Sequence, residues 1–397
     1  MRSRAASILL GGLAALTLLA GCASASPTAP VPTSRDLGPS PSATPSPTPT
    51  PPTPAEKAAE RLSGMSERQK LATMLMLHFP GTDAAALSGF MRSTGAGGFI
   101  LMGDNVAATA ADTAAVTTAL TLDPGLPPLV GIDQEGGVVS RLREDAFPAA
   151  AALRQQPPAA TREAFAQRAQ LVRSAGANLN FGILADETAD RSSFIFGRVL
   201  GATPEDAAAR VEQAVAGEHG IVLSTLKHFP GHGLTEADSH VSLPSSGISW
   251  SDWQAGPAIP FQRGVSAGAE AVMFGHLVLT SVDGRPASLS ARWHDILRND
   301  LGFRGLAVTD DMLMLQHSGV AAYRDPLQNA IAAINAGNDV LLYVLAADPS
   351  VSGVDPAALL DGLEAAVADG RIDARRVDDA VQRVLETRIA LAGAGAG

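Results

Sequence analysis

The sequence predicts an α/β fold in which eight parallel strands close into one barrel, with helices outside. Short apolar runs recur along the chain, and alanine-rich stretches with helical spacing separate them. Strands that alternate with helices imply a parallel sheet. The apolar runs occupy residues 74–77, 98–102, 129–133, 179–184, 223–228, 271–276, 306–310 and 339–343.

The clearest helical stretches lie between these runs, at residues 162–175, 204–220 and 326–336. Eight strand–helix units in a chain of this length match a (β/α)8, TIM-like barrel with some long loops. A doubly wound open sheet is the alternative, but its glycine-rich dinucleotide turn is missing. The glycine cluster at residues 95–98 precedes an apolar run instead of following one.

A third observation favours the barrel, because polar residues of chemical interest follow the ends of the apolar runs. They are Asp133, Asp186, Lys227 with His228, His276 and Asp310. In a barrel of this kind the active site forms from several strand ends at the carboxyl face. We therefore expect these side chains to gather at one mouth of the barrel.

The first 22 residues are expected to be an export signal. Arg2 and Arg4 form a basic start, residues 8–20 are apolar, and Leu19-Ala20-Gly21-Cys22 ends the segment. The run is too short to cross a bilayer as a helix, and its end resembles the bacterial lipoprotein box. We expect Cys22 to carry a lipid that anchors the protein at the extracytoplasmic face of the membrane. Cys22 is the only cysteine, so an internal disulfide and a multi-thiolate metal site are excluded.

Residues 23–55 are rich in Pro, Ser and Thr and hold eleven of the 27 prolines. This composition favours an extended, disordered spacer, because it supplies too few apolar side chains for a core. We expect residues 56–397 to form the single catalytic domain. The formal charge of −11 argues against a nucleic acid or an anionic lipid surface as the main partner.

One segment concentrates the polar chemistry of the chain. It reads Lys227-His228-Phe229-Pro230-Gly231-His232-Gly233 and is followed by Asp238-Ser239-His240. The glycines and the proline exclude a regular helix, so a loop after a buried strand is predicted. Loops held on a rigid scaffold are where functional residues concentrate.

These motifs resemble those of family 3 glycoside hydrolases, in particular the branch of single-domain β-N-acetylglucosaminidases. The Lys227–His240 segment carries the resemblance, together with a substrate loop at residues 131–137 and Arg141. Further matches lie at residues 98–105, 286–290 and 301–305, and at Thr309-Asp310-Asp311-Met312. The resemblance covers residues 56–391.

The resemblance implies a retaining mechanism, which needs a nucleophile and a proton donor. Asp310 is then the nucleophile, and His240, held by Asp238, is the acid and base. Side chains of adjacent residues in an extended chain point to opposite sides. We therefore expect Asp311 to face away from the substrate. Leu234 replaces an aspartate that family members often carry before the Asp–His pair, which leaves the leaving-group preference open.

The resemblance also implies a set of substrate-binding side chains. They are Asp133, Arg141, Arg198, Lys227 and His228. No cofactor or metal is expected. His228, His232 and His240 allow a zinc hypothesis, but the loop gives these residues no fixed ligand spacing.

The resemblance thus implies a hydrolase that removes terminal β-linked N-acetylglucosamine, with cell-wall peptidoglycan fragments as the expected carbohydrate partner. A monomer is expected. One alternative is a phosphorylase, since a histidine acid does not repel phosphate as a carboxylate would. The other is a lipoprotein that binds wall fragments without cleaving them.

Overall fold

The structure is a computed structural model that describes residues 51–235 and 242–395. The segment Pro52–Gly397 forms one compact unit. Each predicted apolar run coincides with one strand of its main sheet. The strands are β1 (Leu75–Leu77), β2 (Gly98–Leu101), β3 (Leu129–Ile132), β4 (Leu179–Leu184), β5 (Leu223–Phe229), β7 (Ala271–Phe274), β9 (Leu306–Thr309) and β10 (Leu341–Tyr343).

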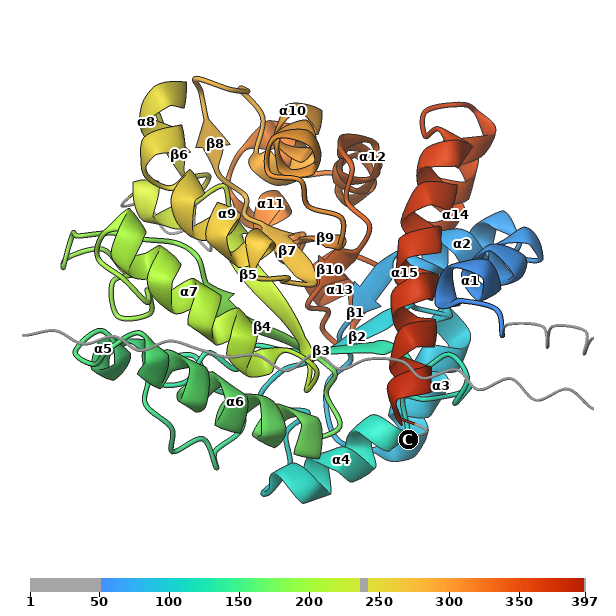
Figure 1. The fold of residues 1–397 in the computed structure, drawn as a ribbon. Coiled ribbons are helices and arrows are strands. Elements are labelled where there is room, and N and C mark those ends of the chain that lie inside the picture. The colour runs from blue at the N-terminus through green and yellow to red at the C-terminus, as the bar shows by residue number, and fades with distance from the viewer. Residues whose placement is uncertain (1–50, 236–241, 396–397) are drawn as a thin grey trace, which may run out of the picture. The chain divides into compact units, whose positions relative to one another are not determined.

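These strands pair in parallel in the order β10-β1-β2-β3-β4-β5-β7-β9. A parallel bridge between Val308 of β9 and Val340, just before β10, joins the two edges of the sheet. The N–H of Thr309 donates to the carbonyl of Val340 at 3.0 Å across the same junction. The sheet therefore forms a nearly closed barrel, as predicted, and the doubly wound open sheet is excluded (Figure 1).

Helices lie between successive strands and around the barrel (Figure 1). The longer helices are α1 (Pro54–Ser63), α2 (Glu67–Thr73), α3 (Ala84–Thr94), α4 (Ala110–Thr118), α6 (Ala159–Ser174), α7 (Pro204–Glu218), α9 (Ala258–Ser266), α12 (Pro326–Ala336), α14 (Pro356–Ala368) and α15 (Ala374–Gly395). Their starts follow local rules. Thr203 caps α7 by accepting from the N–H of Asp206, and Pro204 occupies the first turn.

Shorter elements complete the connections. A separate pair of two-residue strands, β6 (Ser245–Ser246) and β8 (Val278–Leu279), lies outside the barrel sheet. The short helices are α5 (Ala150–Leu153), α8 (Trp250–Ala255), α10 (Ala291–Asp295), α11 (Leu313–His317) and α13 (Pro349–Ser352). These segments account for the long loops that the sequence predicts.

The interior of the barrel is filled by apolar side chains from alternate strand positions. Leu179 and Phe181 of β4 belong to this cluster, with Met76 of β1 and Met273 of β7. A Cβ on Gly131 of β3 would come within 2.6 Å of the Phe181 ring. Glycine at this position therefore leaves room for the aromatic ring inside the barrel.

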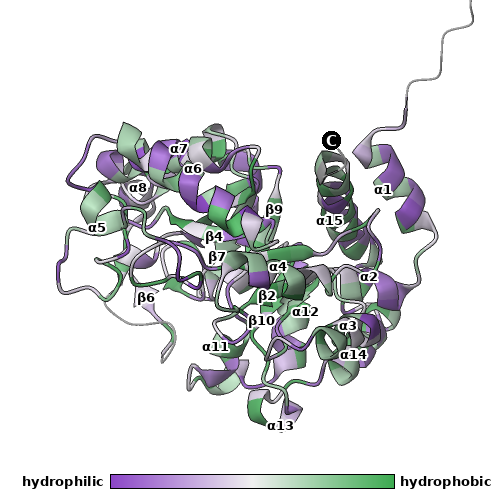
Figure 2. Ribbon diagram, turned by 90° about the horizontal axis from the view of Figure 1, so that it is seen from below, coloured by the Kyte–Doolittle hydropathy of each residue, from purple (hydrophilic) through white to green (hydrophobic). Residues whose placement is uncertain are grey.

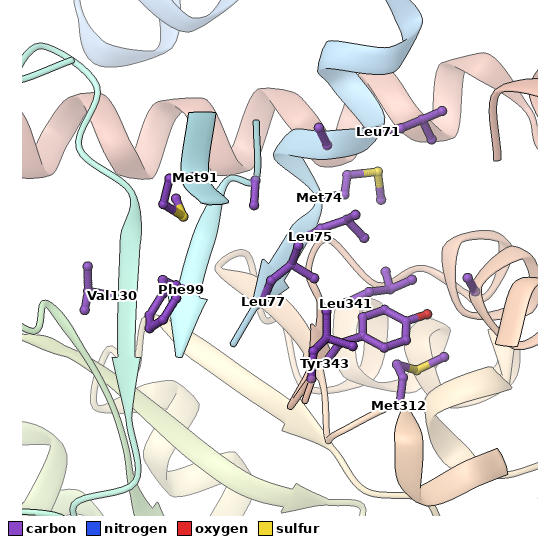
Figure 3. Packing of buried hydrophobic residues seen from close by; sticks show 14 of the residues in the cluster. Leu71, Met74, Leu75, Leu77, Met91, Phe99, Val130, Met312, Leu341 and Tyr343 are labelled. Carbon is purple, nitrogen blue, oxygen red and sulfur yellow. The ribbon is translucent and has the colours of Figure 1, made fainter. Parts of the chain in front are cut away.

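A second layer of apolar packing joins the strands to the helices outside them. Figure 3 shows Leu75 and Leu77 of β1, Phe99 of β2 and Leu341 of β10 among the side chains of this cluster. The hydropathy colouring shows the same division, with mainly hydrophobic strands at the centre and a largely hydrophilic α1 at the outside (Figure 2). Burial of these side chains supplies most of the free energy that holds the barrel.

Helix α15 packs against the amino ends of the strands. Arg388 donates to the carbonyls of Leu126 and Pro127, just before β3. Asp339, just before β10, accepts from Arg376 and Arg383 of α15. The carboxyl ends lie at the opposite mouth. No helix in the described ranges, α15 included, is long and apolar enough to span a membrane.

Candidate active site

Most of the predicted site residues come from the carboxyl ends of the barrel strands. Asp133 follows β3, Lys227 and His228 belong to β5, and Asp310 follows β9. Arg198 arrives on the long connection between β4 and α7. Since parallel strands run in one direction, these ends share one mouth of the barrel.

Five charged side chains form one connected network at this mouth. Lys227 Nζ lies 2.9 Å from Asp133 Oδ1 and 2.8 Å from Glu135 Oε1. Arg198 donates to Glu135 through two parallel bonds, Nε to Oε2 at 2.9 Å and Nη2 to Oε1 at 2.7 Å. Arg141 Nη2 donates to Asp133 Oδ2 at 3.2 Å. The network holds three cations and two carboxylates, so it carries a net positive charge.

Mutual pairing keeps these groups charged although they are buried or half-buried. Burial alone raises the pKa of Asp133, but Lys227 and Arg141 outweigh it and hold the pKa at about 2. The pKa of Glu135 is also lowered, because Lys227 and Arg198 outweigh burial. In turn, Asp133 and Glu135 raise the pKa of Lys227 against the opposite effect of burial. Ionised donors and acceptors are thus available for sugar hydroxyls.

A second cluster centres on Asp186, two residues beyond β4. Its side chain is fully buried, at 0% exposure. Oδ2 accepts from the N–H of His228 at 3.0 Å and lies 2.7 Å from His228 Nδ1, while Oδ1 accepts from the N–H of His232 at 2.6 Å. Burial raises the pKa of Asp186, but His228 first and then His232 bring it below the ordinary value.

This arrangement fixes the ring of His228. Because the carboxylate of Asp186 can only accept, Nδ1 of His228 carries the proton. Its Nε2 is then the nitrogen left for other partners. The ring of His228 meets the ring of His232 edge-on, with centroids 5.8 Å apart.

Asp310 is held by backbone contacts on both sides. Its N–H donates to Phe274 O at 2.9 Å, and its Oδ1 accepts from the N–H of Asp311 at 2.8 Å. Burial raises the pKa of its carboxyl, but His228, and after it His276, lower the pKa below the ordinary value. Asp310 is therefore a carboxylate at neutral pH, as a nucleophile requires.

Asp311 has a different environment. Its Oδ1 accepts from the N–H of Leu313 at 3.2 Å and of Val344 at 3.0 Å. It ties the end of β9 to the end of β10. Oδ1 of Asp311 thus accepts two backbone bonds, and the orientation of Asp311 away from the substrate stays a prediction.

His276, after β7, braces the same strand ends. Its Nε2 lies 2.9 Å from Asp311 O and its Nδ1 lies 2.7 Å from Ser288 Oγ. The carbonyl can only accept, so Nε2 carries the proton and Nδ1 accepts from the hydroxyl. Burial lowers the pKa of His276, which favours this neutral form.

The substrate loop that carries Asp133 and Glu135 rests on a buried polar network. Asn180 of β4 accepts from Gln134 N at 3.1 Å and donates to Gln134 O at 3.1 Å and to Glu218 Oε1 at 2.6 Å. The Gln134 side chain donates to Asp145 at 2.7 Å, and Arg168 donates to the same oxygen at 2.7 Å. These contacts hold the loop after β3 in place against the barrel.

The structure thus brings together most of the predicted site residues. They are Asp133, Arg141, Arg198, Lys227, His228 and Asp310. Asp238 and His240 lie outside the described residues, so their pairing stays a prediction, as does the zinc hypothesis that includes His240.

Two residues of this site received no role from the sequence. Glu135 lies within the quoted Gln-Glu-Gly-Gly motif, and its position two residues after Asp133 was the available signal. Asp186 was noted at a strand end, yet nothing in its sequence neighbourhood indicated a histidine partner 42 residues away.

Comparisons with known proteins agree with this geometry. The family model described as glycosyl hydrolase family 3 N terminal domain matches residues 66–387. The chain therefore belongs to glycosyl hydrolase family 3. A β-hexosaminidase of Stenotrophomonas maltophilia (strain K279a) is 34% identical over 339 residues, covering 79% of this chain and 98% of the relative.

Solved structures give the same result. A family 3 β-N-acetylglucosaminidase from Paenibacillus sp. str. FPU-7 superposes with a TM-score of 0.74 at 30% identity, over 83% of this chain and 63% of that one. A β-N-acetylhexosaminidase from Beutenbergia cavernae DSM 12333 gives 0.72 at 29% identity, over 82% and 98%. The structure of M tuberculosis LpqI gives a TM-score of 0.70 at 29% identity, over 84% of this chain and 95% of that one.

Proposed function

We propose that this enzyme removes terminal β-linked N-acetylglucosamine by a retaining mechanism in which Asp310 is the nucleophile. The observation that carries the proposal is the environment of Asp310. It is a half-buried, ionised carboxylate at the mouth of the barrel, and His228, His276 and Lys227 lower its pKa. Its relatives named β-hexosaminidase and β-N-acetylglucosaminidase support the same activity.

In the first step the carboxylate of Asp310 attacks the anomeric carbon, and the bond to the leaving oxygen breaks. His240, oriented by Asp238, gives its proton to that oxygen. In the second step His240 takes a proton from water, the water attacks the anomeric carbon, and the ester to Asp310 breaks. The assignment of His240 and Asp238 rests on the resemblance of their motif.

The charged network supplies the recognition in this proposal. Lys227, Arg198 and His228 Nε2 are groups that can bond sugar hydroxyls, and Asp133 can accept from them, with Arg141 holding its carboxylate. Removal of one hydrogen-bonding group of the sugar would remove a hydrogen bond to a charged group, which costs binding free energy. A site of this kind discriminates strongly among sugars.

The proposed natural substrates are N-acetylglucosaminyl-muramyl fragments of peptidoglycan. The support is the sequence Leu19-Ala20-Gly21-Cys22, which resembles a lipoprotein box and would anchor the enzyme beside the cell wall. Residues 23–55 would then form the spacer between the anchor and the catalytic domain of residues 56–397.

The test is turnover of aryl glycosides of N-acetylglucosamine, glucose and xylose by the wild-type enzyme and by Asp310→Ala, with and without phosphate. We expect the wild type to hydrolyse only the N-acetylglucosaminide and the variant to lose at least about a thousandfold in kcat. Formation of sugar phosphate would instead identify the phosphorylase. Binding of muramyl fragments without turnover would identify the non-catalytic protein.

A further inference from the structure

We propose that Phe194 forms the platform on which the second sugar of the substrate, the aglycone pyranose, stacks. The inference rests on the proposed function. It concerns the aglycone of the substrate, which the proposed function does not assign to any residue. It assigns a specificity-determining role to a side chain outside the charged network.

The loop that carries Phe194 is anchored in the site at both ends. Asp186 at its start accepts from His228 and His232. Arg198 at its end donates twice to Glu135. Phe194 lies between the two anchors, so its position relative to the site is fixed.

The two residues after Phe194 hold the loop by packing against the rest of the domain. The side chain of Phe194 is therefore not required to hold the loop in place. Ile195 is fully buried in a cluster with Leu184 and Val199. Phe196 packs beneath the guanidinium of Arg154, 4.6 Å from its ring centroid. Phe194 is 37% exposed, and among the described residues it is the one aromatic member of the exposed large hydrophobic side chains.

A chain of rings connects Phe194 with His228 at the mouth of the barrel. Its ring meets His232 edge-on with centroids 5.0 Å apart, and His232 meets His228 at 5.8 Å. His228 belongs to β5 and Asp310 follows β9, so both lie at the carboxyl mouth of the barrel. Phe194 is therefore the solvent-side end of a series of rings that begins at the mouth that holds Asp310.

The chemistry of the exposed ring suits a sugar. The face of a pyranose presents C–H groups, which are attracted by the negative face of an aromatic ring, and their contact removes apolar surface from water. Aromatic side chains are common lining groups of ligand sites for this reason. When the anomeric carbon lies at Asp310, the leaving oxygen and the aglycone point away from that carboxylate. The aglycone would therefore extend outward, toward the rim where Phe194 lies.

The experiment compares two substrates of the full-length enzyme. N-acetylglucosaminyl fluoride has no aglycone ring, whereas the disaccharide N-acetylglucosaminyl-N-acetylmuramic acid has one. Phe194→Ala should lower kcat/KM for the disaccharide about tenfold, which corresponds to about 1.4 kcal/mol, and should change it less than about twofold for the fluoride. Phe194→Trp should keep the disaccharide activity.

Leu122→Ala is the matched control, because Leu122 is also an exposed large hydrophobic residue but precedes β3, at the other mouth of the barrel. Equal loss on both substrates, or no loss on the disaccharide, would overturn the role of Phe194 while leaving the proposed function intact. Failure of the wild type on both substrates would overturn the proposed function and the inference together. If Phe194→Trp lost as much activity on the disaccharide as Phe194→Ala does, the inference would also be overturned.

Discussion

Asp186 binds His228 twice, at the backbone N–H and at Nδ1, through the same carboxylate oxygen. Its other oxygen holds the N–H of His232. One buried side chain therefore sets both the course of the loop after β5 and the direction of the His228 ring.

The first prediction concerns this anchor. Asp186→Asn should lower kcat/KM by about 10- to 100-fold, because hydrogen bonds to a charged group contribute about 1.5–3 kcal/mol each and the amide can replace only part of them. The matched control is Asp190→Asn, an exposed residue of the same loop. Kinetics that are the same for both variants would show that the Asp186–His228 contact does not position the ring.

The second prediction concerns the shared carboxylate of the charged network. Glu135→Gln leaves the charges of Lys227 and Arg198 opposite a neutral amide, with Asp133 as the remaining carboxylate. Since Glu135 and Lys227 are buried, we expect the free energy of unfolding to fall by about 3 kcal/mol, measured by urea denaturation. The control is Glu163→Gln, which replaces an exposed carboxylate on α6. It should change the free energy of unfolding by less than about 0.5 kcal/mol.

The third prediction concerns the pH dependence of stability. Burial, and to a smaller extent Glu270, raise the pKa of Glu218 to about 8 from 4.5, although Asn180 donates to it. Between these two values the unfolded chain has lost this proton and the folded chain keeps it. The free energy of unfolding therefore falls as the pH rises from about 4.5 to 8, by at most about 1.4 kcal/mol per pH unit from this group.

Replacement of Glu218 by Gln removes the titration. We expect the free energy of unfolding, measured by thermal unfolding between pH 5 and 8, to fall less steeply with pH in Glu218→Gln than in the wild type. The two slopes should differ by at most about 1.4 kcal/mol per pH unit. Glu212→Gln on the same helix is the control, because its carboxylate is exposed and paired with Arg263. Parallel curves for the wild type and Glu218→Gln would contradict the raised pKa.

The fourth prediction tests packing inside the barrel. Gly131→Ala would place a methyl group 2.6 Å from the Phe181 ring. We expect a loss of about 1–3 kcal/mol in stability from overpacking. Gly89→Ala in α3 meets no atom within 4 Å and should gain up to about 1 kcal/mol from helix propensity. If Gly131→Ala and Gly89→Ala changed the free energy of unfolding equally in denaturant titrations, the interior of the barrel would not be tightly packed at Gly131.

The sequence was sufficient for the barrel because its strands are short, apolar and separated by helical segments. The strand ends also located Asp133, Lys227 and Asp310 at one mouth, since parallel strands share a direction. Sequence spacing gives no information on which side chains meet across that mouth. The Glu135–Arg198 and Asp186–His228 pairs join loops 63 and 42 residues apart, and only the folded chain reveals them.

The most direct measurement of the central claim is the identity of the residue that carries the sugar during turnover. A fluorinated N-acetylglucosaminyl fluoride that slows the second step should accumulate the glycosyl-enzyme, and peptide mass spectrometry should find one sugar on Asp310. The Asp310→Ala variant should remain unlabelled under the same conditions. A label on Asp311 or on any other residue, or turnover by Asp310→Ala at the wild-type rate, would contradict the account.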